Sequence, residues 1–284
     1  MLRPILKWAG AKTKLVPQIR ALVPADTRRL VEPFVGSGAV ALNLALKENL
    51  IADANPDVIA VYDALAHDPI RFVRDCQALF IPGHNSRGAF EHLRKEFNLS
   101  HDRYRRACLF VYLNRHGYNG LCRYNQKGGF NVPFGRYTTP RFPGCEFAAF
   151  RQFLRHAEIR CADFRPIIAG AGRGDFVYCD PPYSPLSKTA NFTGYARAGF
   201  SHRDQIDLVD ACCAAAARGA VAVISNHDTP VTRQLYSAAT NLIPLQVSRL
   251  ISCDVANRTK VSELLVVYAP ESEGQLNHAT TRKG

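Results

Sequence analysis

The sequence lacks the features that would place a protein in a membrane, outside the cell or around a metal. No run of 18 apolar residues occurs among the 284, and the first residues carry no signal-peptide core. We therefore expect no membrane-spanning helix and a cytoplasmic location. The nine cysteines are odd in number and never spaced Cys-x-x-Cys, which argues against a disulfide framework. The dispersed histidines show no metal-binding spacing, so we predict no metal site.

Acidic residues are in deficit. Asp and Glu number 24 against 36 Lys and Arg, which gives a formal net charge of +12. Residues 101–160 alone hold eleven basic and three acidic residues, a local excess of +8. Such an excess favours a polyanionic partner, with a merely solvated basic face as the alternative.

Short apolar runs alternate with helical stretches, which is typical of an α/β fold with a mostly parallel sheet. The predicted strands lie within residues 30–35, 49–52, 157–163, 174–179 and 221–225. Residues 55–112 have helical spacing only, so we interpret them as an insertion. Two late runs, 242–251 and 261–268, predict an antiparallel hairpin that closes the sheet. The polar residues from 271 onward are expected to form a flexible tail.

The first predicted strand runs into a glycine turn that ends in Gly36-Ser37-Gly38, and a helix is expected from Ala39 to Glu48. The two glycines permit a tight turn and close approach of the backbone to a ligand. The pattern is not Gly-x-Gly-x-x-Gly, so a dinucleotide is not favoured. Asp53 follows Gly36 by 17 residues at the end of the second strand, where it can accept hydrogen bonds from ribose hydroxyls. A helix N-cap is the alternative.

Asp180-Pro181-Pro182-Tyr183 follows the buried run 176–179. Two prolines force a turn where the strand ends, so an acid, a carbonyl and an aromatic ring project from its carboxyl end. The Asp180 carboxylate and the Pro181 carbonyl can accept both hydrogens of an exocyclic amine, while Tyr183 stacks on its ring. This favours methyl transfer to such an amine. The alternative is a strand–turn with a solvated acid.

Residues 114–142 interleave Arg, Asn, Tyr and Gly without apolar periodicity, and Gly128-Gly129 predicts a hairpin turn. Arg side chains pair with guanine and Asn side chains with adenine, and aromatic rings wedge between bases. We interpret the segment as a recognition loop, with an ordinary glycine-rich loop as the alternative.

Three other stretches carry weaker signals. The N-terminal arm around Trp8 is interpreted as a ligand-facing loop. The alternative is that Trp8 anchors this arm to the core. Residues 184–200 suit a flap beside the site, and Ser201 with Asp204 predicts a capping box. Asn226-His227-Asp228 lacks an accompanying nucleophile signature, so we predict a turn and helix cap there.

These motifs together resemble the Dam-type (D12 class) adenine-specific DNA methyltransferases, enzymes typified by action on GATC. The resemblance runs from about Leu6 to Tyr268. It is strongest in Leu6–Gly10, Leu30–Gly36, Leu113–Asn125 apart from His116, Phe130–Tyr137, Cys179–Tyr183, Thr189–Thr193 and Ile224–Thr229. The N-terminal loop departs from the family's usual Gly-Gly-Lys, because it reads Gly10-Ala11-Lys12.

The resemblance implies a class I methyltransferase fold, with a mostly parallel seven-stranded sheet and an inserted, mainly helical DNA-recognition domain. Residues 1–55 and 145–270 would form the catalytic domain, 56–144 the target-recognition domain and 271–284 a flexible tail. The implied reaction moves a methyl group from S-adenosylmethionine to adenine N6 in duplex DNA, within GATC, after base flipping. We expect a monomer that needs no metal.

The resemblance also assigns residues to roles. The catalytic motif would be Asp180, Pro181, Pro182 and Tyr183. The cofactor would be bound by Trp8, Lys12, Phe34, Gly36, Gly38, Asp53 and Asp180. DNA would be contacted by Lys7, Arg115, Tyr118, Asn119, Leu121, Arg123, Asn125, Pro133, Arg136 and Tyr137. Within the last set, Lys7 resembles the family lysine at the first guanine, and Arg123 resembles the arginine that reads the other half-site.

Three rival functions follow from the same residues. Two are methylation of RNA adenine and methylation of a protein glutamine, and the latter usually has Asn at the place of Asp180. The third is a DNA-binding protein that has kept the fold without catalysis.

Overall fold

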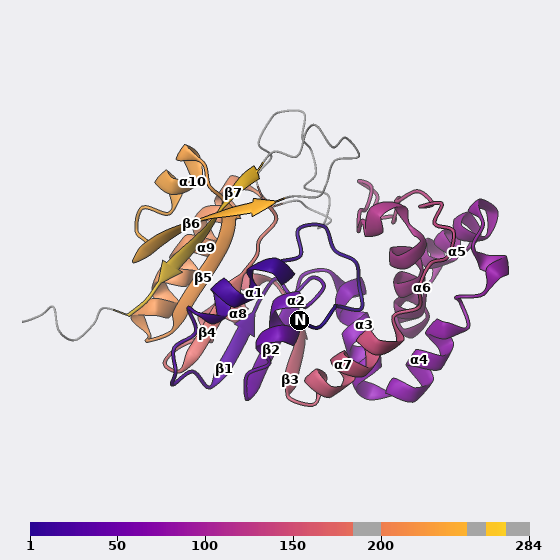
Figure 1. Cartoon of the computed structure of the whole chain (residues 1–284), viewed down its shortest axis with the longest axis horizontal. Coiled ribbons are helices and arrows are strands. Elements are labelled where there is room, and N and C mark those ends of the chain that lie inside the picture. Colours follow the sequence, from indigo (N-terminus) through magenta and orange to yellow (C-terminus); the bar gives the residue numbers. More distant parts are fainter. Residues whose placement is uncertain (184–199, 249–259, 271–284) are drawn as a thin grey trace, which may run out of the picture.

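The computed structural model describes residues 1–183, 200–248 and 260–270. Its centre is a seven-stranded sheet with the strand order β3-β2-β1-β4-β5-β7-β6 (Figure 1). Neighbouring strands are parallel except around β7, which pairs antiparallel with both β5 and β6. The predicted mostly parallel sheet with a closing hairpin is therefore confirmed. In chain order the strands are β1 (Arg29–Glu32), β2 (Glu48–Asp53), β3 (Ala157–Cys161), β4 (Asp175–Cys179), β5 (Val221–His227), β6 (Asn241–Ser248) and β7 (Lys260–Tyr268).

Helices occupy most of the connections between strands. The helices are α1 (Val16–Arg20), α2 (Ala39–Leu44), α3 (Pro56–His67), α4 (Pro69–Gln77), α5 (Arg87–Leu99), α6 (Arg103–His116), α7 (Gly144–Leu154), α8 (Phe164–Ala169), α9 (His202–Ala217) and α10 (Pro230–Leu235). Short 3₁₀ turns are η1 (Thr13–Leu15), η2 (Pro82–His84) and η3 (Tyr118–Gly120). Figure 1 shows α4, α5 and α6 gathered beside the β3 edge, away from β6 and β7. None of the described helices is both long and apolar enough to cross a membrane.

The sheet has an apolar layer on each face because its strand residues alternate in direction. In β4, Phe176 and Tyr178 join one buried cluster, while Val177 and Cys179 join the other. The second cluster contains residues of α8 and α9. The first includes residues of α2 and continues into α3, α5 and α6, so the helical insertion shares its core with one face of the sheet.

Local sequence signals explain several element boundaries. The predicted capping box of Ser201 and Asp204 is confirmed at the start of α9. The Gly128-Gly129 turn is confirmed, because Asn125 N donates to Gly129 O at 2.8 Å beside a Tyr124–Phe130 bridge. The predicted flap falls mostly on 184–199 and the tail on 271–284, which lie outside the described residues.

Two local predictions were wrong. The helix expected from Ala39 to Glu48 ends at Leu44, because Ala45 adopts a left-handed conformation (φ +45) and Glu48 begins β2. The turn expected at 226–228 is also misplaced: Asn226 and His227 are the last, buried residues of β5. Antiparallel pairing with β7 extends β5 to His227, and Thr229 caps α10 instead.

Candidate active site

The two predicted motifs meet at one edge of the sheet. Strands β1 and β4 are neighbours, and the strand order reverses between them. Residues 33–38 leave the carboxyl end of β1, and residues 180–183 leave the carboxyl end of β4. Ligands of open α/β sheets bind at such a reversal point. The topology thus places the glycine turn after β1 and the Asp-Pro-Pro-Tyr motif after β4, on either side of the point where the strand order reverses.

The glycine turn is fitted closely to Trp8. Gly36 has φ +46, and a β-carbon there would lie 2.8 Å from Trp8 Nε1. Gly38 has φ +69, and a β-carbon there would lie 2.9 Å from the Phe150 ring. The Tyr62 hydroxyl, on α3, donates to the Gly36 carbonyl at 2.7 Å and holds the turn in place. Both glycines therefore satisfy a left-handed backbone and a close approach at once.

Asp53 ends β2 beside this turn. Its Oδ2 accepts from Gly36 N at 2.9 Å, and its Oδ1 accepts from Asn55 N at 2.8 Å. Burial raises the pKa of Asp53 to about 6, although both backbone bonds favour the charged form. Helix α3 is capped by Asn55, whose side chain accepts from Asp57 N, so the alternative of Asp53 as N-cap is wrong. Each Asp53 oxygen retains a lone pair for a ribose hydroxyl.

Lys12, from the N-terminal arm, forms an ion pair with Asp180. Its Nζ lies 3.0 Å from Asp180 Oδ1 and 3.1 Å from Oδ2, and it donates to Gly10 O at 2.7 Å. Burial is the largest single influence on Lys12 and pulls its pKa down, but the charge and hydrogen bond of Asp180, with Tyr178 and Glu263, together outweigh it, so the pKa is raised. The ammonium is therefore charged and balances the carboxylate. It also lies 4.7 Å from the centre of the Tyr183 ring.

Residues of β5, which the sequence did not identify, support the motif from behind. Ser225 Oγ donates to Asp180 Oδ1 at 2.9 Å. The His227 ring meets the Tyr183 ring edge-on, with centroids 4.5 Å apart. A third contact comes from α9, where Gln205 Nε2 donates to the Pro182 carbonyl at 3.4 Å. A polar residue at the carboxyl end of the strand after the motif was the available sequence signal.

An aromatic group lies beside the glycine turn on the other face. Phe34 stacks on Phe164 with centroids 5.3 Å apart, and Phe200 packs against both at 5.7 Å. Phe200 directly precedes the N-cap of α9, so its position depends on how that helix is anchored. The guanidinium of Arg165 covers the Phe164 ring at 4.5 Å.

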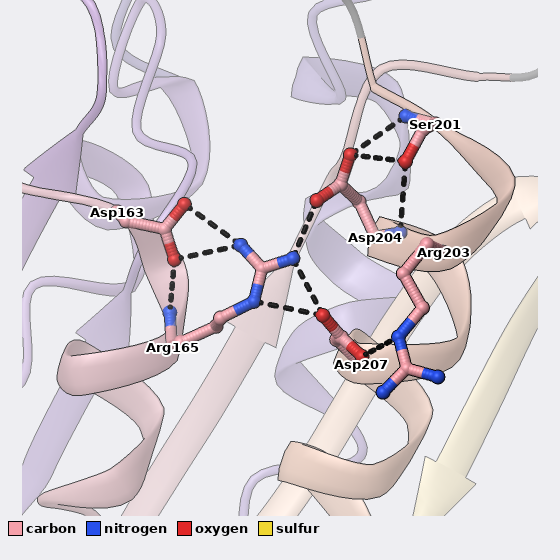
Figure 2. Close-up of polar contacts among 6 residues, drawn as sticks. All are labelled: Asp163, Arg165, Ser201, Arg203, Asp204 and Asp207. Atoms are coloured by element: carbon pink, nitrogen blue, oxygen red, sulfur yellow. Dashed lines mark hydrogen bonds and ion pairs between the residues drawn. The ribbon is translucent and has the colours of Figure 1, made fainter.

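Figure 2 shows how Arg165 anchors the start of α9. Its nitrogens bond Asp163, which precedes α8, and both Asp204 and Asp207 of α9. Hydrogen bonds from Ser201 and then Arg165 lower the pKa of Asp204 to about 2. The sequence indicated the cap of α9 but not the arginine that joins it to α8.

The N-terminal arm joins the recognition loop at Lys7. Asn114, fully buried near the end of α6, accepts from Lys7 N at 2.7 Å and donates to Lys7 O at 2.8 Å. The Lys7 ammonium lies 4.1 Å from the centre of the Tyr137 ring. Burial, followed by the charge of Arg115, lowers the pKa of Lys7. A cavity of about 400 Å³ opens beside Lys7 and is also bordered by Arg3.

The recognition loop folds back on itself and exposes several predicted DNA contacts. Tyr118 N donates to Pro133 O at 2.9 Å, which brings the two ends of the loop together. Arg123 Nε donates to Asn131 Oδ1 at 2.8 Å and holds that guanidinium at the surface. The exposed predicted residues are Tyr118, Asn119, Arg123, Asn125, Pro133 and Arg136, whereas Leu121 and Tyr137 are half-buried.

The side chains of Arg115 and Asn125 also make their contacts within the protein. Arg115 is 8% exposed, and its guanidinium donates to the carbonyls of Pro4 and Ile5. Burial lowers the pKa of Arg115 to about 10. The Asn125 side chain accepts from the backbone of Lys127 and Gly129, at 3.0 and 2.9 Å, and so shapes the hairpin turn. In this structure both side chains organise the loop and arm.

The residues at this reversal point fit the methyl donor that the motifs imply. The glycine turn has no room for side chains, and the Asp53 carboxylate faces it with free lone pairs. The Asp180 carboxylate lies at the carboxyl end of the neighbouring strand, on the other side of the same reversal point. Among the described residues, no group of three His, Cys, Asp or Glu side chains could hold a metal ion.

Known proteins with similar sequences identify the family. The profile of the D12 class N6 adenine-specific DNA methyltransferases matches residues 8–251. The "DNA adenine methylase" of Vibrio cholerae is 46% identical over 274 residues, which cover 96% of this chain and 98% of that protein. The proteins of the same name from Serratia marcescens and Escherichia coli K12 are 48% and 44% identical, each over 94% of this chain and 98% and 96% of their own. The chain belongs to the D12 class of adenine-specific DNA methyltransferases, enzymes of the class I methyltransferase fold that take their methyl group from S-adenosylmethionine.

Proposed function

We propose that this enzyme methylates the adenine of GATC in duplex DNA, after flipping that adenine out of the helix. One observation carries the proposal. The arm of residues 7–12 holds Lys7 in the recognition loop at one end and Lys12 on Asp180 at the other. A base reader and the partner of the catalytic carboxylate are thus five residues apart. Binding of Lys7 to its base would therefore also set the position of Lys12 beside Asp180.

The proposed chemistry depends on alignment. The Asp180 carboxylate and the Pro181 carbonyl accept the two hydrogens of the adenine N6 amine, which directs the nitrogen lone pair at the methyl carbon. S-adenosylmethionine supplies that methyl group as an electrophile on a sulfonium. The N–C bond forms as the C–S bond breaks, and N6 then loses a proton to solvent. Positioning of this kind supplies several kcal/mol of a barrier.

Lone pairs and ring faces support these roles. Among the described residues, Lys12 and Ser225 are the bonding partners of the Asp180 carboxylate, and they leave an acceptor position on Oδ2 for the amine. Tyr183 is held between the Lys12 ammonium and the His227 ring, so its orientation is fixed before a base arrives. Trp8, Phe34 and Asp53 are proposed to hold the cofactor around the glycine turn.

The proposed DNA surface combines Lys7 with the exposed part of the recognition loop. Arg123 would read one base of the other half-site. Tyr118 and Asn119 would fill the gap left by the flipped adenine, since both are exposed beside Pro133. Arg115 would act from within, by fixing the arm that carries Lys7.

The domain assignment follows from these roles. We propose that residues 56–144 form the target-recognition part, and that 1–55 and 145–270 form the catalytic part. The helical insertion shares a core cluster with the sheet, which would keep the two parts in fixed register. The enzyme is proposed to act as a cytoplasmic monomer on duplex DNA.

Two substitutions test the proposal. Asp180→Ala should abolish methyl transfer while duplex affinity stays largely intact, and retained turnover would contradict the role of the carboxylate. Arg123→Ala should cost about 1–3 kcal/mol of discrimination at one base pair of GATC. Arg74→Ala, which removes an exposed charge from α4, is the matched control. Uniform weakening on all sequences would instead make Arg123 a phosphate contact.

A further inference from the structure

A chain of two buried hydroxyls ends on the catalytic carboxylate. The Tyr178 hydroxyl donates to Ser225 Oγ at 3.0 Å, and Ser225 Oγ donates to Asp180 Oδ1 at 2.9 Å. Tyr178 and Ser225 are each 0% exposed, so water does not compete for these bonds. Within the part of the chain that the structure describes, the Ser225 hydroxyl has one other acceptor, the Cys179 carbonyl, at the longer distance of 3.4 Å.

The sheet itself sets up this chain. Strands β4 and β5 are parallel, with Cys179 opposite Ile224, so the residues that follow them leave the sheet side by side. Tyr178 and Asp180 lie two residues apart and therefore face the same side. Ser225 emerges on that side from the next strand. Two neighbouring strands thus fix both hydroxyls, whereas Lys12 reaches the carboxylate from the N-terminal arm.

The two oxygens of the Asp180 carboxylate have different hydrogen-bond partners. Oδ1 receives Lys12 at 3.0 Å and Ser225 at 2.9 Å, which fills its two acceptor positions. Of the residues that the structure describes, Oδ2 receives only Lys12, at 3.1 Å. The terminal torsion of an aspartate is soft, so a lysine that touches both oxygens does not by itself fix the carboxylate plane. Ser225 provides the asymmetric contact that does.

We propose that Ser225, with Tyr178 behind it, is a positioning residue that orients the Asp180 carboxylate so that Oδ2 accepts the target amine. The inference rests on the proposed role of Asp180 in amine binding. Loss of the serine hydroxyl leaves Oδ1 free to compete for the amine and lets the carboxylate turn. The transfer step should then slow while both substrates still bind.

Single-turnover methyl transfer tests this directly. The GATC duplex is mixed with an excess of enzyme that is saturated with S-adenosylmethionine, so that each duplex is methylated once, and N6-methyladenine is followed in time. Ser225→Ala should lower the rate about ten- to a hundredfold, the range for a lost hydrogen bond to a charged group. Its dissociation constants for cofactor and duplex should stay within about twofold of wild type, which a general structural defect would not leave intact.

Matched variants complete the test. Tyr178→Phe should give a smaller loss, because Ser225 keeps its own hydrogen for Asp180. Tyr104→Phe removes a hydroxyl that donates to Asp75 in the helical insertion, at 2.9 Å, and should leave the rate unchanged. If Ser225→Ala proves too unstable to assay, Tyr178→Phe decides the question. A wild-type transfer rate in Ser225→Ala, or in Tyr178→Phe if Ser225→Ala cannot be assayed, overturns the inference.

The wild-type reaction separates this inference from the proposed function. If the wild type forms no N6-methyladenine, the proposed function fails. If wild type and Ser225→Ala form it equally fast, the function stands and only the positioning role fails.

Discussion

One added carbon at Gly120 should uncouple the recognition loop from Lys7. Gly120 has φ +62, and a β-carbon there would lie 2.2 Å from Lys7 Cβ and 2.8 Å from Lys7 Cδ. Carbon atoms pack at about 3.5–4.0 Å, so one partner must move by more than 1 Å. Lys7 cannot retreat without breaking the two backbone bonds to Asn114, at 2.7 and 2.8 Å. Gly120→Ala therefore displaces the arm, the turn η3, or both.

The expected cost has two parts. A left-handed alanine costs about 1–2 kcal/mol of folding free energy. Displacement of Lys7 should further lower discrimination at the first guanine of GATC, by about 1–3 kcal/mol if its base contact is lost. The assay compares kcat/KM on GATC with kcat/KM on duplexes altered at that guanine, alongside urea unfolding.

Two glycines serve as controls. Gly219→Ala carries a comparable backbone cost, because its φ is +95, but its nearest neighbour is Arg173 at 3.2 Å. Gly88→Ala in α5 meets nothing within 4 Å and should be neutral or stabilising. Gly219→Ala should lose stability and keep discrimination. Wild-type discrimination in Gly120→Ala would refute the coupling between the turn and Lys7.

Three further predictions concern charge. Affinity for S-adenosylmethionine should weaken as the pH falls through about 6, because Asp53 then gains a proton and loses an acceptor; titration calorimetry should show a much flatter profile for Asp53→Asn. The pKa of Asp204 is lowered to about 2, first by Ser201 and then by Arg165, so its bonds to both residues stabilise the fold above the unfolded pKa of about 4 and are lost as the pH falls toward 2. The difference in unfolding free energy between wild type and Arg165→Gln should therefore shrink over that range, and a constant difference would count against the network. Duplex affinity should fall with salt by a log–log slope of several units, whereas a flat response would argue against phosphate contacts.

The sheet was predictable because its strands are short apolar runs with turn residues at both ends. Phe176–Cys179 and Val221–Ser225 both became buried strands, and the late hairpin formed as expected. The helix after the glycine turn was overextended because residues 45–48 contain no breaker. Its end is set by Ala45 in a left-handed conformation, which composition does not signal.

The site was predictable where one motif carries one role, and less so where roles depend on contacts across the fold. Asp53 and Asp180 lie where the spacing placed them, at the carboxyl edge of the sheet. Ser225 and His227 were not identified, because their partners are 45 and 44 residues away in sequence. Arg115 was grouped with the exposed loop, yet its partners are carbonyls of the N-terminal arm.

Methyl transfer to defined duplexes tests the central proposal most directly. Labelled S-adenosylmethionine is incubated with duplexes that contain GATC, each single-base variant of it, or a scrambled sequence, and the product nucleoside is identified by mass spectrometry. We predict N6-methyladenine in the GATC duplex alone. N6-methyladenine in a variant would keep the chemistry and contradict the proposed reading by Lys7 and Arg123. No transfer to any duplex, with the cofactor still bound, would contradict the proposed function.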